Sequence, residues 1–347
     1  KKNYKMFEII NINYTPQQTR QLLLQPSYDS TADALNLFQR VGWFDEEGKY
    51  KLYQDTTSQN LIRLAKSCKR TWSSLTNIWE RCISSARVEV AIKQCYDEFE
   101  CTVLNGWVNN LEQGDAIYSA ELRQYILTKI QQGINRDINR AIFFGTMNST
   151  DPVAAANPNF NYANGLWTVH FPKLVAENIV PNVATSASAL TSGQAVTILR
   201  AMVAQAPTAM RSFSNAEKSF FLSSALYQAL QADIETSTFN GGFATQIYSP
   251  DGVATGQLYY QGIKVIEMPR WDEVFAADFA TPIANYGILT VDKNIAWGIK
   301  LADSGAQTRI WTNQDDDTLR AVSKFRIGCD YVAGNMFSIA SPVADVI

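Results

Sequence analysis

The side chains that could carry out catalysis are few, because the chain of 347 residues contains a single histidine, His170. This histidine lies in the largely apolar segment 167–171, where a histidine is more often a structural side chain than a general base. Serine and cysteine hydrolases need a histidine beside the nucleophile, and the usual zinc sites need several. The sequence also contains no GxSxG, GxxxxGK or GxGxxG motif. We therefore predict no catalytic centre, no metal site and no cofactor.

Three consecutive aspartates, Asp315, Asp316 and Asp317, are the residues best suited to a hard cation such as Ca²⁺ or Mg²⁺, because clustered carboxylate oxygens suit these ions. They follow the turn-forming residues 312–314 and lack the spacing of a known metal-binding loop. The alternatives are a solvated turn and a turn that pairs with cations of another subunit. We favour these alternatives over a metal site.

The cysteines are odd in number, and no two of them form a CxxC pair. This usage favours reduced thiols in a cytosolic compartment over a disulfide framework. We expect small, buried hydrophobic side chains at all of these positions. They are Cys68, Cys82, Cys95, Cys101 and Cys329.

Composition limits the classes of partner. Charged residues make up 18% of the chain, against about 25% in typical soluble domains. Large permanent interfaces are depleted in charge, so this deficit favours a chain that buries much of its surface against neighbours, or equally a monomer whose surface is rich in uncharged polar residues. The net charge of −3 argues against a dedicated nucleic-acid binder. No apolar run is long enough to span a membrane, and Lys at position 1 predicts a natural chain that begins earlier or has been trimmed.

The strongest helix pattern covers residues 119–144, and Gly145 is expected to end it. Its apolar residues recur at every fourth position, so that the row winds about halfway round the helix and its two ends must pack against different neighbours. The row consists of Leu122, Ile126, Ile130, Ile134, Ile138 and Ile142.

Shorter patterns predict the other elements. The first part of the chain is expected to contain an extended arm over 1–27, a helix over 32–41, a strand over 49–53, a helix over 61–79 and a strand over 87–100. After an irregular stretch, an α/β unit is expected. It begins with a helix capped by Thr191 or Ser192 and ended by Pro207. A strand over 220–224, a helix over 225–235, a strand pair over 258–268 and a hairpin formed by 287–291 and 295–299 are expected to follow.

The last predicted element is a long strand over 320–332, which pairs with 308–313 through the acidic turn. Apolar and charged residues alternate almost strictly along it, as in a half-buried antiparallel strand. Its charged face carries Arg320, Lys324, Arg326 and Asp330.

The order of these elements resembles the major capsid proteins of tailed bacteriophages, whose Hong Kong 97-type fold encapsulins share. The helix that closes in 141–145 looks like the spine helix of that family, and 326–332 followed by 335–339 looks like its closing basic strand and final apolar segment. Segments 218–222 and 258–265 are similar to strands of its α/β part. The resemblance implies an α+β fold with a long spine helix, a peripheral-domain antiparallel sheet and an axial α/β domain.

The resemblance also implies a division of the chain. Residues 1–43 would form an N-terminal arm, 86–164 with 293–335 the peripheral domain with its spine helix over 119–144, and 165–292 with 336–347 the axial domain. The family places an extended two-stranded loop at 44–85, where this sequence shows helical spacing. An extended loop and a helical insertion therefore both remain open for this segment.

A structural subunit without enzymatic activity is implied, one that self-assembles through pentamers and hexamers into the icosahedral head of a tailed phage or prophage around double-stranded DNA. The implied partners are other copies, scaffold, portal and decoration proteins, and packaged DNA through weak sequence-independent contacts, with no membrane. The implied location is the virion, assembled in the bacterial cytoplasm. We predict intersubunit contacts by Arg320, Lys324 and Arg326 with the aspartates 315–317; the alternative is a solvated sheet face.

Two other functions stay open at this point. An encapsulin-like nanocompartment shell would have the same fold and a different cargo. An unrelated α/β enzyme or carbohydrate-binding module would use paired carboxylates, and the 8 Trp and 15 Tyr would suit stacking on sugars.

Overall fold

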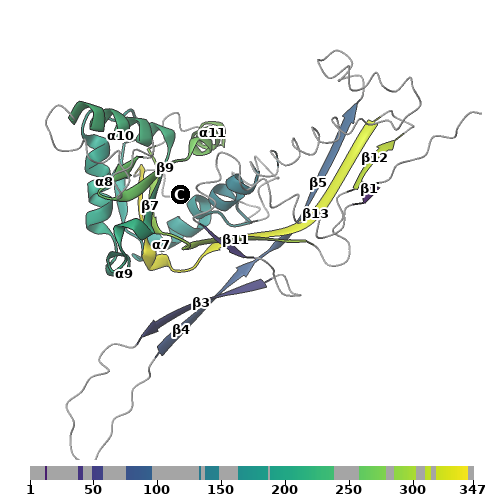
Figure 1. The fold of residues 1–347 in the computed structure, drawn as a ribbon, viewed down its shortest axis with the longest axis horizontal. Coiled ribbons are helices and arrows are strands. Elements are labelled where there is room, and N and C mark those ends of the chain that lie inside the picture. Colours follow the sequence, from purple (N-terminus) through teal and green to yellow (C-terminus); the bar gives the residue numbers. More distant parts are fainter. Residues whose placement is uncertain are drawn as a thin grey trace, which may run out of the picture.

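The computed structural model describes residues 12–13, 38–41, 49–57, 76–95, 133, 137–147, 163–186, 188–237, 258–278, 285–301, 309–313 and 318–342. These residues form two six-stranded sheets, a separate two-stranded ribbon and several helices. In Figure 1 the second sheet and its helices lie on the left, the long strands of the first sheet run to the upper right, and the ribbon points to the lower left. The α+β class predicted from the sequence is confirmed.

The first sheet is organised around its longest strand, which has neighbours on both sides. Its main path runs through β1 (Ile12–Asn13), β12 (Arg309–Asn313), β13 (Thr318–Tyr331), β11 (Ile295–Leu301) and β2 (Gln39–Val41), and β5 (Ala86–Cys95) pairs with the other edge of β13. All pairs are antiparallel except β11 with β2. The predicted strands over 87–100, as far as Cys95, and over 320–332, and the predicted pairing of the latter with 308–313, are confirmed.

One face of β13 packs against the end of the predicted long helix. Residues 137–144 are helical, and Ile138 and Ile142 lie in the same buried cluster as Phe325 and Ile327 of β13. The amide of Gly145 makes the last helical hydrogen bond, to the carbonyl of Ala141, so the predicted helix end is confirmed. Apart from Gly133, which is helical, residues 119–136 of the prediction lie outside the described residues.

The second sheet is covered on both faces. Its strand order is β6 (Asn182–Thr185), β14 (Phe337–Pro342), β10 (Gly287–Val291), β7 (Lys218–Leu222), β9 (Ile263–Glu267) and β8 (Tyr259–Tyr260). Every residue of β7 is buried. Phe220 and Leu222 point into a cluster with α8 (Gln194–Gln205) and α10 (Ser224–Ser237). The intervening Phe221 joins the cluster that contains α7 (Phe171–Ala176), α11 (Pro269–Asp278) and the end of the long helix.

Strands β10 and β11 do not form the predicted hairpin. Both strands exist, but β10 pairs with β7 and β14 in the second sheet, whereas β11 pairs with β13 and β2 in the first. The intervening turn, with Lys293 at φ 65°, therefore carries the chain from one sheet to the other. The prediction was wrong because each strand is buried by tertiary neighbours that local spacing cannot identify.

The ribbon consists of β3 (Lys49–Thr57) and β4 (Thr76–Ser84), which are antiparallel along their whole described length. The helix predicted over 61–79 is wrong at its described end, because Thr76–Trp79 belong to β4; residues 58–75 lie outside the described residues. Likewise, the helix predicted over 32–41 is wrong at 39–41, which form β2 and pair with β11. In both places pairing with a distant strand overrides the local apolar spacing.

The start of α8 also differs from the prediction. Gly193, rather than Thr191 or Ser192, is the N-cap, and it supplies no side chain. The Asp233 carboxylate of α10 accepts hydrogen bonds from the amides of Gly193 (2.5 Å) and Val196 (3.3 Å), which satisfies part of the helix end from another element. Among the described residues no helix is long and apolar enough to cross a membrane.

Candidate functional site at the base of the ribbon

The base of the ribbon packs against the first sheet at a glycine, Gly328. A Cβ added at Gly328 of β13 would lie 2.7 Å from the carbonyl oxygen of Ser84, so only glycine permits this approach. Beside it, Leu52, Ile83 and Ala296 form a small buried cluster. The base of the ribbon is therefore held by close packing against β13 and β11.

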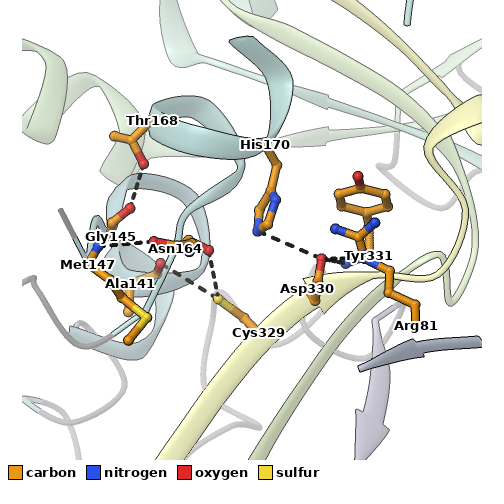
Figure 2. Close-up of polar contacts among 10 residues, drawn as sticks. All are labelled: Arg81, Ala141, Gly145, Met147, Asn164, Thr168, His170, Cys329, Asp330 and Tyr331. Atoms are coloured by element: carbon orange, nitrogen blue, oxygen red, sulfur yellow. Dashed lines mark hydrogen bonds and ion pairs between the residues drawn. The ribbon is translucent and has the colours of Figure 1, made fainter. Parts of the chain in front are cut away.

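An ion pair fixes the same contact. Nε of Arg81, on β4, donates to Oδ1 of Asp330, on β13, at 2.9 Å, and the backbone amide of Tyr331 donates to the same oxygen at 2.8 Å. The Arg81 guanidinium also lies 3.6 Å from the ring centroid of Tyr331, in a cation–π contact. Only 9% of Asp330 is exposed, so its charge depends on these partners. Figure 2 shows Arg81 and His170 approaching Asp330 from different elements.

His170 is the third residue at this aspartate. Its Nε2 lies 3.7 Å from Oδ1 of Asp330, beyond hydrogen-bond distance, and its ring meets that of Tyr331 edge to face at 5.2 Å. Burial lowers the pKa of His170 below its usual value of 6.5; the Asp330 carboxylate partly offsets this effect, and the cations Arg81 and Lys173 reinforce it. His170 is therefore neutral at pH 7 and packs as a structural side chain.

Cys329 connects this site to the end of the long helix. Its Sγ lies 3.4 Å from the carbonyl oxygen of Asn164 and 3.9 Å from that of Ala141 (Figure 2). Burial raises the pKa of the Cys329 thiol, and the Asp330 carboxylate adds to the effect, so the thiol is a poor nucleophile and a poor metal ligand. The prediction of buried cysteines is confirmed for Cys329 but wrong for Cys82, which is exposed on the ribbon. Cys95 belongs to β5, and Cys68 and Cys101 lie outside the described residues.

The chain after the helix is tied to the same place. The amide of Gly165 donates to the carbonyl of Gly145 at 2.6 Å, as does the hydroxyl of Thr168, and the amide of Met147 donates to Oδ1 of Asn164 at 3.0 Å. The site thus joins the ribbon, β13, the helix end and the segment containing η4 (Leu166–His170). Among the residues that the structure describes, no group of His, Cys, Asp and Glu side chains could hold a metal ion. We call the contacts of Arg81, Asp330, Gly328 and Cys329 the joint, because they connect the ribbon to β13 and to the helix end.

The residues predicted to make intersubunit contacts lie farther along the same strand. Arg320, Lys324 and Arg326 are partly exposed on the face of β13 that points away from the buried cluster. Nζ of Lys324 pairs with Glu89 of β5 at 3.1 Å. The aspartates 315–317 lie outside the described residues. The structure therefore brings the three cations to one face, and their contact with a neighbour stays a prediction.

The pairing of Arg81 with Asp330 was not predicted from the sequence, since the two residues are 249 positions apart. One signal was present: Asp330 is the acidic exception on the otherwise basic face of its strand.

Comparison of sequences finds no family model and no curated protein that matches the chain. Comparison of structures does find similar folds. A chain of the satellite phage P4 procapsid including size determination (Sid) protein matches with a TM-score of 0.59 at 13% identity, over 97% of this chain and 93% of that one. The capsid of a native GTA particle matches with a TM-score of 0.51 at 13% identity, over 90% of each chain. This is the fold of a phage capsid protein.

The capsid fold, of the Hong Kong 97 type, confirms the resemblance inferred from the order of elements. The capsid of an empty GTA particle gives the same result, with a TM-score of 0.50 and 13% identity over 90% of each chain. The matched regions span nearly the whole of each chain. At this identity the likeness resides in the arrangement of the buried elements.

Proposed function

We propose that the chain is the major capsid protein of a tailed phage or prophage, a structural subunit without catalytic activity. It self-assembles through pentamers and hexamers into an icosahedral head that encloses double-stranded DNA. The observation that supports this most is the likeness to the P4 procapsid chain over 97% of this chain and 93% of that one.

The division of the chain expected from the resemblance is part of the proposal. Strands β5, β11, β12 and β13 of the first sheet fall within 86–164 and 293–335, the proposed peripheral domain. All six strands of the second sheet fall within 165–292 and 336–347, the proposed axial domain. Residues 1–43 form the arm, and 44–85 form the extended loop. The paired strands β3 and β4 support the loop over a helical insertion.

The ribbon suits a subunit that is completed by its neighbours. A two-stranded ribbon is at best marginally stable in water, and among the described residues its buried side chains, Leu52 and Ile83, lie at its base. Packing against a second copy would bury the remainder of both strands. Identical subunits that exchange such contacts close into rings and shells. The joint of Arg81 and Asp330 then sets the direction in which the ribbon meets its neighbour.

The proposed partners are other copies, together with scaffold, portal and decoration proteins and packaged DNA, and the proposed location is the virion after assembly in the host cytoplasm. An encapsulin-like shell has the same fold, so its cargo distinguishes it. We expect particles from the producing bacterium, after nuclease treatment, to release genome-length double-stranded DNA. Particles that hold folded protein cargo and no protected DNA would establish the encapsulin-like alternative instead.

A further inference from the structure

The solvent-facing side of β13 carries a short row of cations that continues onto β5. In the antiparallel register Arg326 of β13 lies opposite Arg87 of β5. Arg87 is exposed and Arg326 is partly exposed. Neighbouring strands are about 4.8 Å apart, so the row places like charges side by side.

Like charges directly opposite each other on paired strands destabilise a sheet. The described carboxylates of this face have other partners: Glu89 pairs with Lys324 at 3.1 Å, and Asp330 pairs with Arg81 at 2.9 Å. Among the described residues no carboxylate forms an ion pair with Arg87 or Arg326. A sequence that retains this unfavourable arrangement on a solvent-facing surface points to an anionic partner that relieves it.

The anion cannot come from the acidic turn of the same copy. Asp317 directly precedes Thr318, the first residue of β13, and Arg326 lies eight residues farther along this continuous strand. At about 3.3 Å per residue the two ends are about 26 Å apart, more than the side chains can span. In the sequence, residues 314–317 connect β12 to β13.

Carboxylates fit this row better than phosphates. A surface built for DNA belongs to a chain or domain with a strongly basic balance, and this chain has a net charge of −3. Each copy contributes one acidic turn and one row of cations, so the two surfaces are equal in number, as a closed assembly of identical subunits requires.

We propose that the pair of Arg87 and Arg326, which we call the cation row, binds the aspartates 315–317 of a second copy. This inference rests on the proposed shell function and identifies one of its intersubunit contacts. It adds Arg87 to the predicted set and makes the contact head to tail, because the row and the acidic turn belong to different parts of the sequence.

The test uses the full chain and measures the assembled fraction by sedimentation, with electron microscopy of the products. Arg87→Glu with Arg326→Glu is expected to lower the apparent association constant by about tenfold or more, since like charges then face each other. Adding Asp315→Arg and Asp317→Arg to that variant is expected to restore assembly. The matched control, Arg200→Glu with Arg270→Glu, makes the same change in net charge on α8 and α11 and is expected to assemble normally.

A neutral pair guards against simple misfolding. Arg87→Gln with Arg326→Gln is expected to raise the melting temperature of the unassembled subunit, because the repulsion is gone, and to weaken assembly at the same time. A structural role alone would move both quantities in the same direction.

Each other outcome has a defined meaning. If the wild-type chain assembles and the Glu variant assembles equally well, the inference is overturned and the proposed function stands. An equal loss in the control, or no restoration by the charge swap, also overturns it. Normal shells that protect less DNA would assign the row to phosphates. A wild-type chain that never assembles would remove the proposed function itself.

Discussion

Asn294 and Ala333 exchange two hydrogen bonds across the two chain segments that pass between the sheets. Nδ2 of Asn294 donates to the carbonyl of Ala333 at 3.1 Å, and the amide of Ala333 donates to Oδ1 of Asn294 at 2.9 Å. The backbone carbonyl of Asn294 also accepts from the amide of Val332 at 2.8 Å, and its side chain donates to Oγ1 of Thr290 at 3.1 Å. Asn294 is buried, with 3% of its surface exposed. One side chain therefore holds the link between the two sheets.

Replacing Asn294 by Ala is expected to destabilise the subunit strongly, because buried partners on both segments lose their hydrogen bonds. We expect the free energy of unfolding to fall by about 2–4 kcal/mol, since each buried group left unpaired costs about 1–3 kcal/mol. Urea denaturation of the unassembled subunit measures this change. Asn215→Ala, which removes an exposed amide that bonds to Gln261, is the control and should change stability by less than about 1 kcal/mol. Equal effects of the two substitutions would contradict the role given to Asn294.

The pair of Arg81 and Asp330 is expected to stabilise the ribbon base by about 1–2 kcal/mol, less than a fully buried pair because 36% of the Arg81 side chain is exposed. A double-mutant cycle with Arg81→Ala and Asp330→Ala gives this coupling energy directly. Hydrogen exchange should show faster exchange in β3 and β4 in each variant, with β7 unchanged. A coupling near zero, or faster exchange spread evenly over both sheets, would show that the pair does not hold the ribbon.

His170 predicts a loss of stability in mild acid. Burial lowers its pKa in the folded subunit below the value of 6.5 that applies when the chain is unfolded. At mildly acidic pH the unfolded chain therefore binds a proton more readily than the folded one. The contribution of His170 to the free energy of unfolding is fully present above about pH 6.5. It falls as the pH drops toward the lower pKa of the folded state, by at most about 1.4 kcal/mol per pH unit. Denaturant titrations between pH 5 and pH 8 of the wild type and His170→Gln measure the difference. Parallel curves for the two proteins would contradict the prediction.

Two glycines should respond in opposite ways to the same substitution. At Gly328 a new Cβ would meet the carbonyl of Ser84 at 2.7 Å, so Gly328→Ala must displace the ribbon base and should cost about 1–3 kcal/mol. At helical Gly133 the new Cβ meets no described atom within 4 Å outside its own stretch of helix, and Gly133→Ala should stabilise the subunit by about 0.5–1 kcal/mol. Thermal melting compares the two. Stabilisation by Gly328→Ala would show that the ribbon does not rest on β13.

Sequence patterns predicted the elements whose burial is regular. The alternation along 320–332 identified β13, and Gly145 ends the long helix as expected. Both signals are local: a strand with one buried face alternates, and a helix terminates at a residue without a Cβ. The family resemblance, carried by the order of such elements, then gave the fold.

The joint and the link between the sheets were not predictable in this way. Arg81 meets Asp330 across 249 positions, and the cap of α8 is supplied by Asp233, 37 residues beyond Val196. The strands at 287–291 and 295–299 have the spacing of a hairpin and belong to different sheets. The apolar spacing over 61–79 fits one face of a helix, yet residues 76–79 pair with β3. In each case the deciding partner is distant in the sequence, and local spacing carries no information about it.

The central claim, that this chain is a subunit of a closed shell, is tested most directly by electron microscopy of the purified full chain. The account predicts hollow icosahedral particles whose surface is divided into pentamers and hexamers, each subunit extending its ribbon onto a neighbour. A preparation that contains only compact, unassociated subunits at every protein concentration would contradict it.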